Sequence, residues 1–128
     1  MKSQRDFRNY LAGGALAFGV VLLTSQILRL IYGGLIMNIY FAAHLAGGFL
    51  GGYLVARVRG KDFTQTGTVT AVMAYILEFV YMYLFEGEFT DYYAVLSLLI
   101  GGIIGAMFFR ARMERERISA LQVSPRAL

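Results

Sequence analysis

The sequence predicts an all-α polytopic membrane protein, in which four transmembrane helices form two antiparallel hairpins. Of its 128 residues, 58% are hydrophobic and 16% are charged, whereas a soluble domain is about one quarter charged. The apolar residues lie in long runs, and about 20 residues are enough for one helix to span a bilayer. The basic residues gather at alternate ends of these runs. These three observations together predict the fold class.

The four spans are expected at about residues 10–30, 36–58, 64–85 and 92–109. Paired glycines interrupt apolar helices, so Gly33 and Gly34 should form the first turn, and a short polar turn begins at Gly60. The loop after the third span is acidic. We therefore divide the chain into a transmembrane domain, 1–112, and a polar tail, 113–128, with the fourth helix continuing to Arg117. The first apolar run exceeds the usual length of about 7–15 residues in a signal peptide, so we expect a retained span.

The charges predict the orientation. Basic residues precede the first span, and further basic residues follow the second span (Arg57, Arg59 and Lys61) and the fourth (Arg110, Arg112, Arg115 and Arg117). By the positive-inside rule, both termini and the middle turn are cytoplasmic. The expected location is the plasma membrane, with the lipid bilayer as the first partner. Because these residues flank apolar runs, the net charge of +4 fits anionic headgroups better than nucleic acid.

Glycines lie at helical spacing in the second and fourth spans. The stretch 45–60 contains two pairs with four-residue spacing, and a similar pattern recurs in the fourth span. The helix-packing glycines predicted in this way are Gly47, Gly48, Gly51, Gly52, Gly101, Gly102 and Gly105. Such stripes let helix backbones approach closely in lipid. The recurrence has two explanations: a parallel internal repeat of one hairpin, or the chance similarity of glycine-rich spans.

The chain resembles a family on these features: four helices with a cytoplasmic N-terminus, a glycine-rich second helix ending GGYLVARVRG, and a third helix that opens with small residues. It resembles the small glycine-rich four-helix membrane proteins of archaea and bacteria that carry no assigned function. The resemblance covers most of residues 10–110. It implies a fold and a membrane location, and it transfers no catalytic or ligand-binding residue.

Glu78 is an ionisable residue that the sequence places inside the third span. It lies ~21 Å from the start of the third helix at 1.5 Å per residue, and a carboxyl group at such depth normally faces the bundle interior with a partner. His44, ~13 Å into the second span, and Arg29, at the end of the first, are the candidate partners. Glu78 with His44 would form a proton or cation site. A pair with Arg29, or a protonated carboxyl group, would be structural, and the residues favour this second interpretation.

Enzyme chemistry has no signature in this sequence. There is no cysteine and only one histidine, and neither nucleophile motifs nor a phosphate-binding loop are found. We therefore expect no enzymatic activity, no cofactor and no metal. The sequence favours a small scaffold or accessory subunit that packs through its glycine faces with itself, as a homo-oligomer, or with larger membrane proteins. The alternative is a small oligomeric channel or transporter for protons or cations, with Glu78 near the path.

Overall fold

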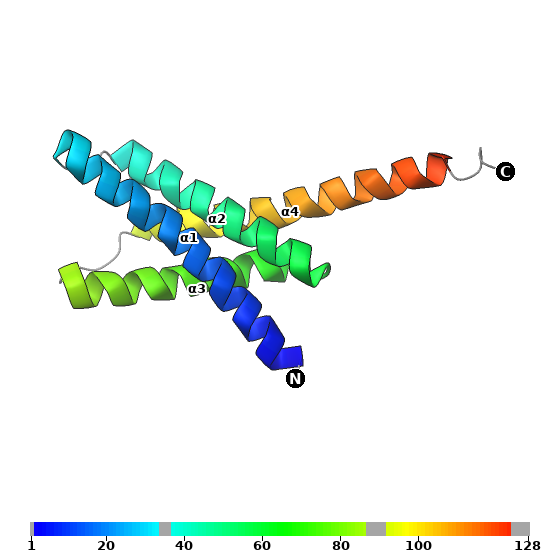
Figure 1. The fold of residues 1–128 in the computed structure, drawn as a ribbon, viewed down its shortest axis with the longest axis horizontal. Helices are drawn as coiled ribbons and strands as arrows, with labels where there is room; N and C mark the ends of the chain where they lie inside the picture. Colours follow the sequence, from blue (N-terminus) through cyan, green and yellow to red (C-terminus); the bar gives the residue numbers. More distant parts are fainter. Residues whose placement is uncertain (1, 34–36, 87–91, 124–128) are drawn as a thin grey trace.

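The computed structural model describes residues 2–33, 37–86 and 92–123, and all its elements are helical. The chain forms α1 (Lys2–Tyr32), α2 (Met37–Arg59), α3 (Phe63–Tyr81), a π-helical turn η1 (Met82–Glu86) and α4 (Tyr92–Val123). Four of these helices are long and apolar enough to cross a membrane. The predicted all-α fold with four spans is therefore confirmed (Figure 1).

Two helices extend beyond the predicted spans. α1 begins at Lys2 rather than near residue 10, and α4 continues to Val123, beyond the predicted end at Arg117. Polar residues with good helix propensity can prolong an apolar helix into water. In α4, Arg110 and Glu114 form an ion pair at 3.2 Å with the i,i+4 spacing that supports such an extension. The acidic loop is predicted to begin at Glu86, which is the last residue of η1, and its other residues, 87–91, lie outside the described residues.

Glycines in the left-handed conformation end α1 and α2. Gly33 has φ 73° and its N–H donates to the carbonyl of Arg29, while Gly60 has φ 70° and donates to the carbonyl of Ala56. Both glycines have the left-handed backbone conformation that commonly ends a helix, and a residue with a Cβ adopts this conformation only with strain. Asp62 is also left-handed, at φ 50°, directly before α3. The predicted breaks after the first and second spans therefore follow from local backbone chemistry.

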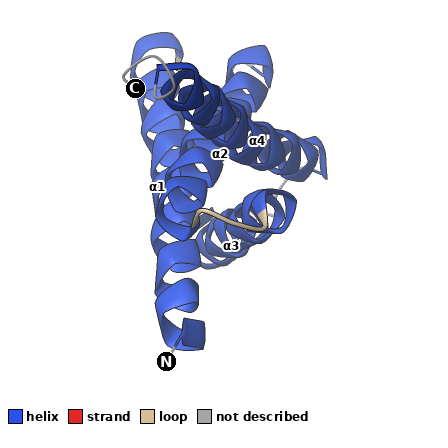
Figure 2. Cartoon of the chain, turned by 90° about the vertical axis from the view of Figure 1, so that its right-hand side faces the viewer, coloured by secondary structure: helices blue, strands red, loops and turns tan. Residues whose placement is uncertain are grey.

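Each helix runs antiparallel to the one before it. The start of α1, the α2–α3 turn and the end at which α4 leaves the bundle therefore lie together at one end of the bundle (Figure 1). We call this the basic end. α2 packs against the other three helices, and α3 also packs against α1 and α4. In the described residues α1 and α4 do not pack on each other, and α2 lies between them (Figure 2). An exact two-fold repeat would relate α1 to α3 and α2 to α4. The contact between α2 and α3 would then have an equivalent contact between α1 and α4, which is missing from the described part of the chain, so the two hairpins are not related by exact two-fold symmetry.

The bundle core consists mainly of small side chains, which bring the helix backbones together. Ala17, Ala56 and Ala74 are fully buried. On α2 the two glycine pairs face different helices. A Cβ on Gly47 would lie 2.6 Å from the carbonyl oxygen of Ala17 in α1, and one on Gly48 would lie 2.6 Å from that of Leu98 in α4. Neither position has room for a larger residue.

The other predicted glycines also meet backbone of the same chain. Gly51 faces Gly13 in α1, whereas Gly52 faces Gly102 in α4. From α4, the partners are Leu45 for Gly101, Gly67 for Gly102 and Phe49 for Gly105. The small-residue faces that the sequence predicts are thus occupied within the bundle, where close packing holds helices together without a hydrophobic driving force.

Candidate functional site

Tyr40, His44 and Glu78 form a buried polar cluster between α2 and α3. The Glu78 carboxylate lies 2.8 and 3.0 Å from Nε2 of His44, and the hydroxyl of Tyr40 donates to its Oε1 at 2.9 Å. The side chains of His44 and Glu78 are 0% and 3% exposed. Tyr40 and His44 are one turn apart on α2, so their rings stack edge to face with centroids 4.4 Å apart. Two groups on α2 therefore converge on one carboxylate of α3.

Hydrogen bonding sets the protons of this cluster. Nδ1 of His44 lies 2.8 Å from the carbonyl oxygen of Tyr40, and because a carbonyl only accepts, Nδ1 carries a hydrogen. One further proton then lies between Nε2 and the Glu78 carboxylate. The pair is either imidazolium with carboxylate or neutral imidazole with carboxylic acid. Both forms have zero net charge, which explains how an acid can be buried at this depth.

A small cavity of about 30 Å³ adjoins the cluster on the side away from the basic end. Tyr40 and Glu78 lie on its wall with Ser25, Gln26 and Arg29 of α1, and the rings of Phe18 and Tyr81 meet across it with centroids 5.5 Å apart. Such a volume holds about two water molecules. Gln26 and Arg29 are exposed, so two polar side chains join the cavity wall to the surface at this end of the bundle, while Phe18, Val21, Leu22 and Met82 make the rest of the wall mainly apolar.

Toward the basic end, the buried face of α3 carries hydroxyl groups. Thr70 donates to the carbonyl of Thr66 at 2.7 Å, and Thr66 donates to the carbonyl of Lys61 at 3.2 Å. Between Thr70 and Glu78, which are ~12 Å apart along the helix, the buried positions are Ala71 and Ala74. Polar side chains along α3 are therefore interrupted at one turn.

Arg59 forms a second polar cluster at the basic end. Its Nη1 donates to the hydroxyl of Tyr10 and to Oγ1 of Thr66, and its Nη2 lies 3.5 Å from Asp6 and 3.7 Å from Asp62. The Arg59 side chain is only 7% exposed, and its Nε is buried without a hydrogen-bond partner in the described part of the chain. Arg59 thereby ties the end of α2 to α1 and α3.

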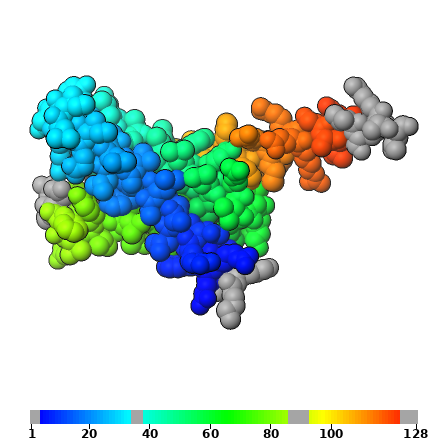
Figure 3. Space-filling view, in the orientation of Figure 1, coloured from blue at the N-terminus to red at the C-terminus, as the bar shows by residue number. Residues whose placement is uncertain are grey.

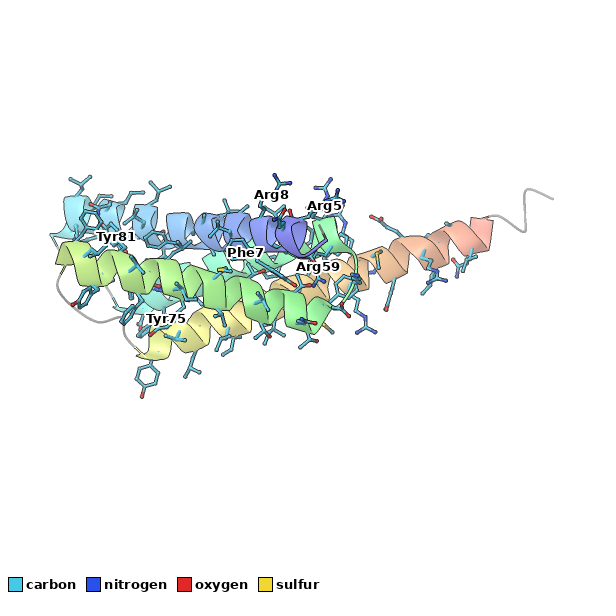
Figure 4. All side chains as sticks on the ribbon, turned by 90° about the horizontal axis from the view of Figure 1, so that it is seen from below. Arg5, Phe7, Arg8, Arg59, Tyr75 and Tyr81 are labelled. Carbon is cyan, nitrogen blue, oxygen red and sulfur yellow. The ribbon has the colours of Figure 1, made fainter. Side chains whose placement is uncertain are left out.

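The remaining basic residues predicted to set the orientation lie on the surface. Arg57, Lys61, Arg110 and Arg112 are exposed. Figure 4 shows Arg5 and Arg8 on α1 at the same end as Arg59, whereas Tyr81 lies at the opposite end. These basic residues therefore share one end of the bundle, as the positive-inside rule requires, whereas Arg29 lies near the opposite end.

Of the two partners expected for Glu78, the structure places His44 at hydrogen-bond distance, while Arg29 lines the cavity. The hydrogen bond from Tyr40 to Glu78 was not predicted from the sequence. A signal was present, because Tyr40 and His44 have the four-residue spacing that puts both on one helix face. The burial of the Arg59 side chain was not predicted either. Asp62, three residues later, is an acidic partner that could have indicated it.

Among the described residues, no three histidine or acidic side chains lie close enough together to hold a metal ion. Comparisons of the chain with protein-family models, with curated proteins and with solved structures give no match. The geometry of this chain is therefore the basis for its proposed function.

Proposed function

We propose that this chain is a small membrane protein that passes protons, or another small cation, across the bilayer, with Glu78 as the group that takes up and releases the ion. The burial of Glu78 against His44, next to a small cavity that Gln26 and Arg29 also line, carries this proposal. An ionisable residue within a membrane span is by default a functional candidate. The proposed role is not enzymatic.

The stability of the fold alone does not explain the buried pair of His44 and Glu78. Replacing a buried ionisable pair by apolar residues of similar volume is often neutral or stabilising. The helices around Glu78 already pack closely through Ala74 and the glycines. A buried ionisable pair that stability alone does not explain, and that adjoins a cavity large enough for water, supports a role in binding an ion.

The proposed exchange changes the charge of the cluster. At rest, one proton lies between His44 and Glu78. Uptake of a second proton from the cavity yields a carboxylic acid beside an imidazolium, and release from the resting state leaves a carboxylate beside a neutral imidazole. Because Ala74 interrupts the polar side chains of α3, transfer to the basic end requires the helices to move. We therefore favour a transporter over an open pore, and we take the basic end as cytoplasmic.

Proton flux in proteoliposomes tests this function. The protein is reconstituted with a pH-sensitive dye inside, and a potassium gradient with valinomycin supplies the driving force. We expect a protein-dependent flux that Glu78→Gln abolishes, because the amide keeps a hydrogen-bonding group there but does not ionise. Tyr83→Phe, at an exposed position, is the matched control and should retain the flux. If neither protons nor sodium or potassium ions pass under any gradient, the transport proposal fails.

A second candidate, a scaffold or accessory subunit, is supported by the extension of α4. Residues 110–122 are all exposed, and this part of α4 extends clear of the bundle (Figure 3). An isolated helix of this length is marginally stable in water, so a partner would stabilise it.

Removal of residues 118–128 tests the accessory role. The truncated protein should keep its unfolding midpoint but lose proteins that co-purify with the full chain in a mild detergent. Identical co-purification by both forms would count against a role for the extension. The glycine positions are unsuitable for this test, because larger residues there would disturb the bundle itself.

A further inference from the structure

We infer that the basic end carries a binding site for the phosphate group of an anionic phospholipid, between α2 and α4. A hollow of about 210 Å³ lies there, lined by Tyr53, Arg57, Phe109, Arg112, Met113 and Glu116. It is separate from the Glu78 cluster, and the inference does not depend on the proposed transport.

The depth of the hollow matches the headgroup region. Arg57 lies ~30 Å along α2 from Met37, and Arg112 lies ~29 Å along α4 from Tyr93, at 1.5 Å per residue. The hydrocarbon core of a bilayer is about 30 Å thick. Both guanidinium groups therefore reach the level at which lipid phosphates lie.

The charged groups favour a phosphate. Arg57 and Arg112 line the hollow, and Arg115 lines an adjoining one that shares Arg112 and Glu116. The carboxylate, Glu116, lies 3.4 Å from Nε of Arg112 and is 71% exposed, so it can swing into water when an anion arrives. Three arginines against one carboxylate leave a net positive charge. Guanidinium groups bind phosphate oxygens with two parallel hydrogen bonds.

Tyr53 holds one of these arginines in place. Nη1 of Arg112 donates to the Tyr53 hydroxyl at 2.8 Å, so the guanidinium is positioned before a ligand binds. Ordering a long side chain in advance lowers the entropy lost on binding. Arg110 pairs with Glu114 as Arg112 pairs with Glu116, but Arg110 does not line the hollow. The site therefore differs from the rest of the basic extension.

Aromatic rings beside the hollow distinguish a lipid from a free phosphate. Tyr53 contacts Phe49, Phe108 and Phe109 with ring centroids 5.5–6.3 Å apart. Phe108 is 54% exposed and lies one turn before Arg112 on α4, where it lines the adjoining hollow and offers an apolar surface. A diacyl lipid would place its phosphate at Arg57 and Arg112 and one acyl chain along these rings.

Native mass spectrometry of the full-length protein in a neutral detergent tests the site. Phosphatidylglycerol and phosphatidylcholine with the same acyl chains are titrated separately. We expect one phosphatidylglycerol to bind more tightly than phosphatidylcholine, and Arg57→Gln or Arg112→Gln to weaken it roughly tenfold, as loss of a charged hydrogen bond does. Tyr53→Phe keeps all charges and should also weaken binding, because it frees Arg112.

The matched control removes the same charge elsewhere. Arg110→Gln with Arg117→Gln should leave phosphatidylglycerol binding unchanged, whereas Arg57→Gln with Arg112→Gln should abolish the preference for the anionic lipid. If the two double variants lost phosphatidylglycerol binding equally, the binding would depend on general surface charge, and the proposed site would be wrong. Competition by inorganic phosphate or glycerol phosphate at concentrations similar to the lipid would overturn the assignment to a lipid. Circular dichroism verifies that each variant is folded.

Discussion

The guanidinium of Arg59 lies over the ring of Tyr10, with its central carbon 5.3 Å from the ring centroid, while also donating to the Tyr10 hydroxyl. The last residue of α2 is thereby fixed to the part of α1 that enters the bundle. A cation above an aromatic face and a charged hydrogen bond are both strong when shielded from water. The basic end is therefore held by specific polar contacts, whereas the middle of the bundle depends on close backbone packing.

Arg59→Lys should destabilise the bundle by about 1–3 kcal/mol, because an ammonium group keeps the charge but cannot reach Tyr10, Thr66 and both carboxylates together. The unfolding midpoint in detergent, followed by circular dichroism, measures the loss. Arg8→Lys, at an exposed position, is the control and should have little effect. Equal midpoints for the two variants would contradict the role of Arg59 as an anchor.

A double-mutant cycle measures the coupling of His44 to Glu78. Glu78→Met leaves His44 buried without its acceptor, and His44→Leu leaves the carboxylate without its main donor, so each single change should be costly. The double variant should lose less than the sum of the two, with a coupling of about 1–3 kcal/mol. Additive losses in free energy of unfolding would mean that the two groups do not share a proton in the folded protein. This result is independent of whether ions are transported.

Gly105→Ala should destabilise the bundle by about 1–3 kcal/mol, the usual cost of overpacking. The added Cβ would overlap the carbonyl oxygen of Phe49, and helix backbone yields less readily than a flexible side chain. Gly19→Ala is the matched control, because a Cβ there meets nothing within 4 Å. Unfolding midpoints of the two variants should therefore differ clearly. A Gly105→Ala variant with an unchanged midpoint would show that the α2–α4 contact is loose, and a destabilising Gly19→Ala would show that this position of α1 is not open.

The absence of cysteine makes the orientation directly testable. Ser119→Cys lies on the extension of α4 and Tyr32→Cys at the opposite end of the bundle, and both positions are exposed. If the basic end is cytoplasmic, a membrane-impermeant maleimide should label Tyr32→Cys in intact cells and Ser119→Cys only after the cells are opened. The reverse labelling pattern would invert the orientation predicted from the charges.

The candidate site shows where prediction from sequence stops. Depth along a helix follows from counting residues, so Glu78 could be placed inside the bilayer and His44 within its reach. Which of two candidate partners meets the carboxylate depends on how α2 and α3 rotate about their axes. Rotation follows from the close fit of glycines and alanines on every face, and the sequence does not specify which face meets which helix.

The sequence by itself determined the number of helices, the breaks after the first and second helices and the gathering of charge at one end. These properties are local, since hydropathy decides whether a segment enters lipid and a left-handed glycine ends a helix wherever it occurs. The tertiary structure alone decided that Gly47 meets α1 while Gly48 meets α4, that Arg59 turns inward, and that Tyr40 joins His44 at Glu78. Each of these contacts joins groups far apart in the chain, and in a core of small residues such contacts depend on the mutual fit of whole helices.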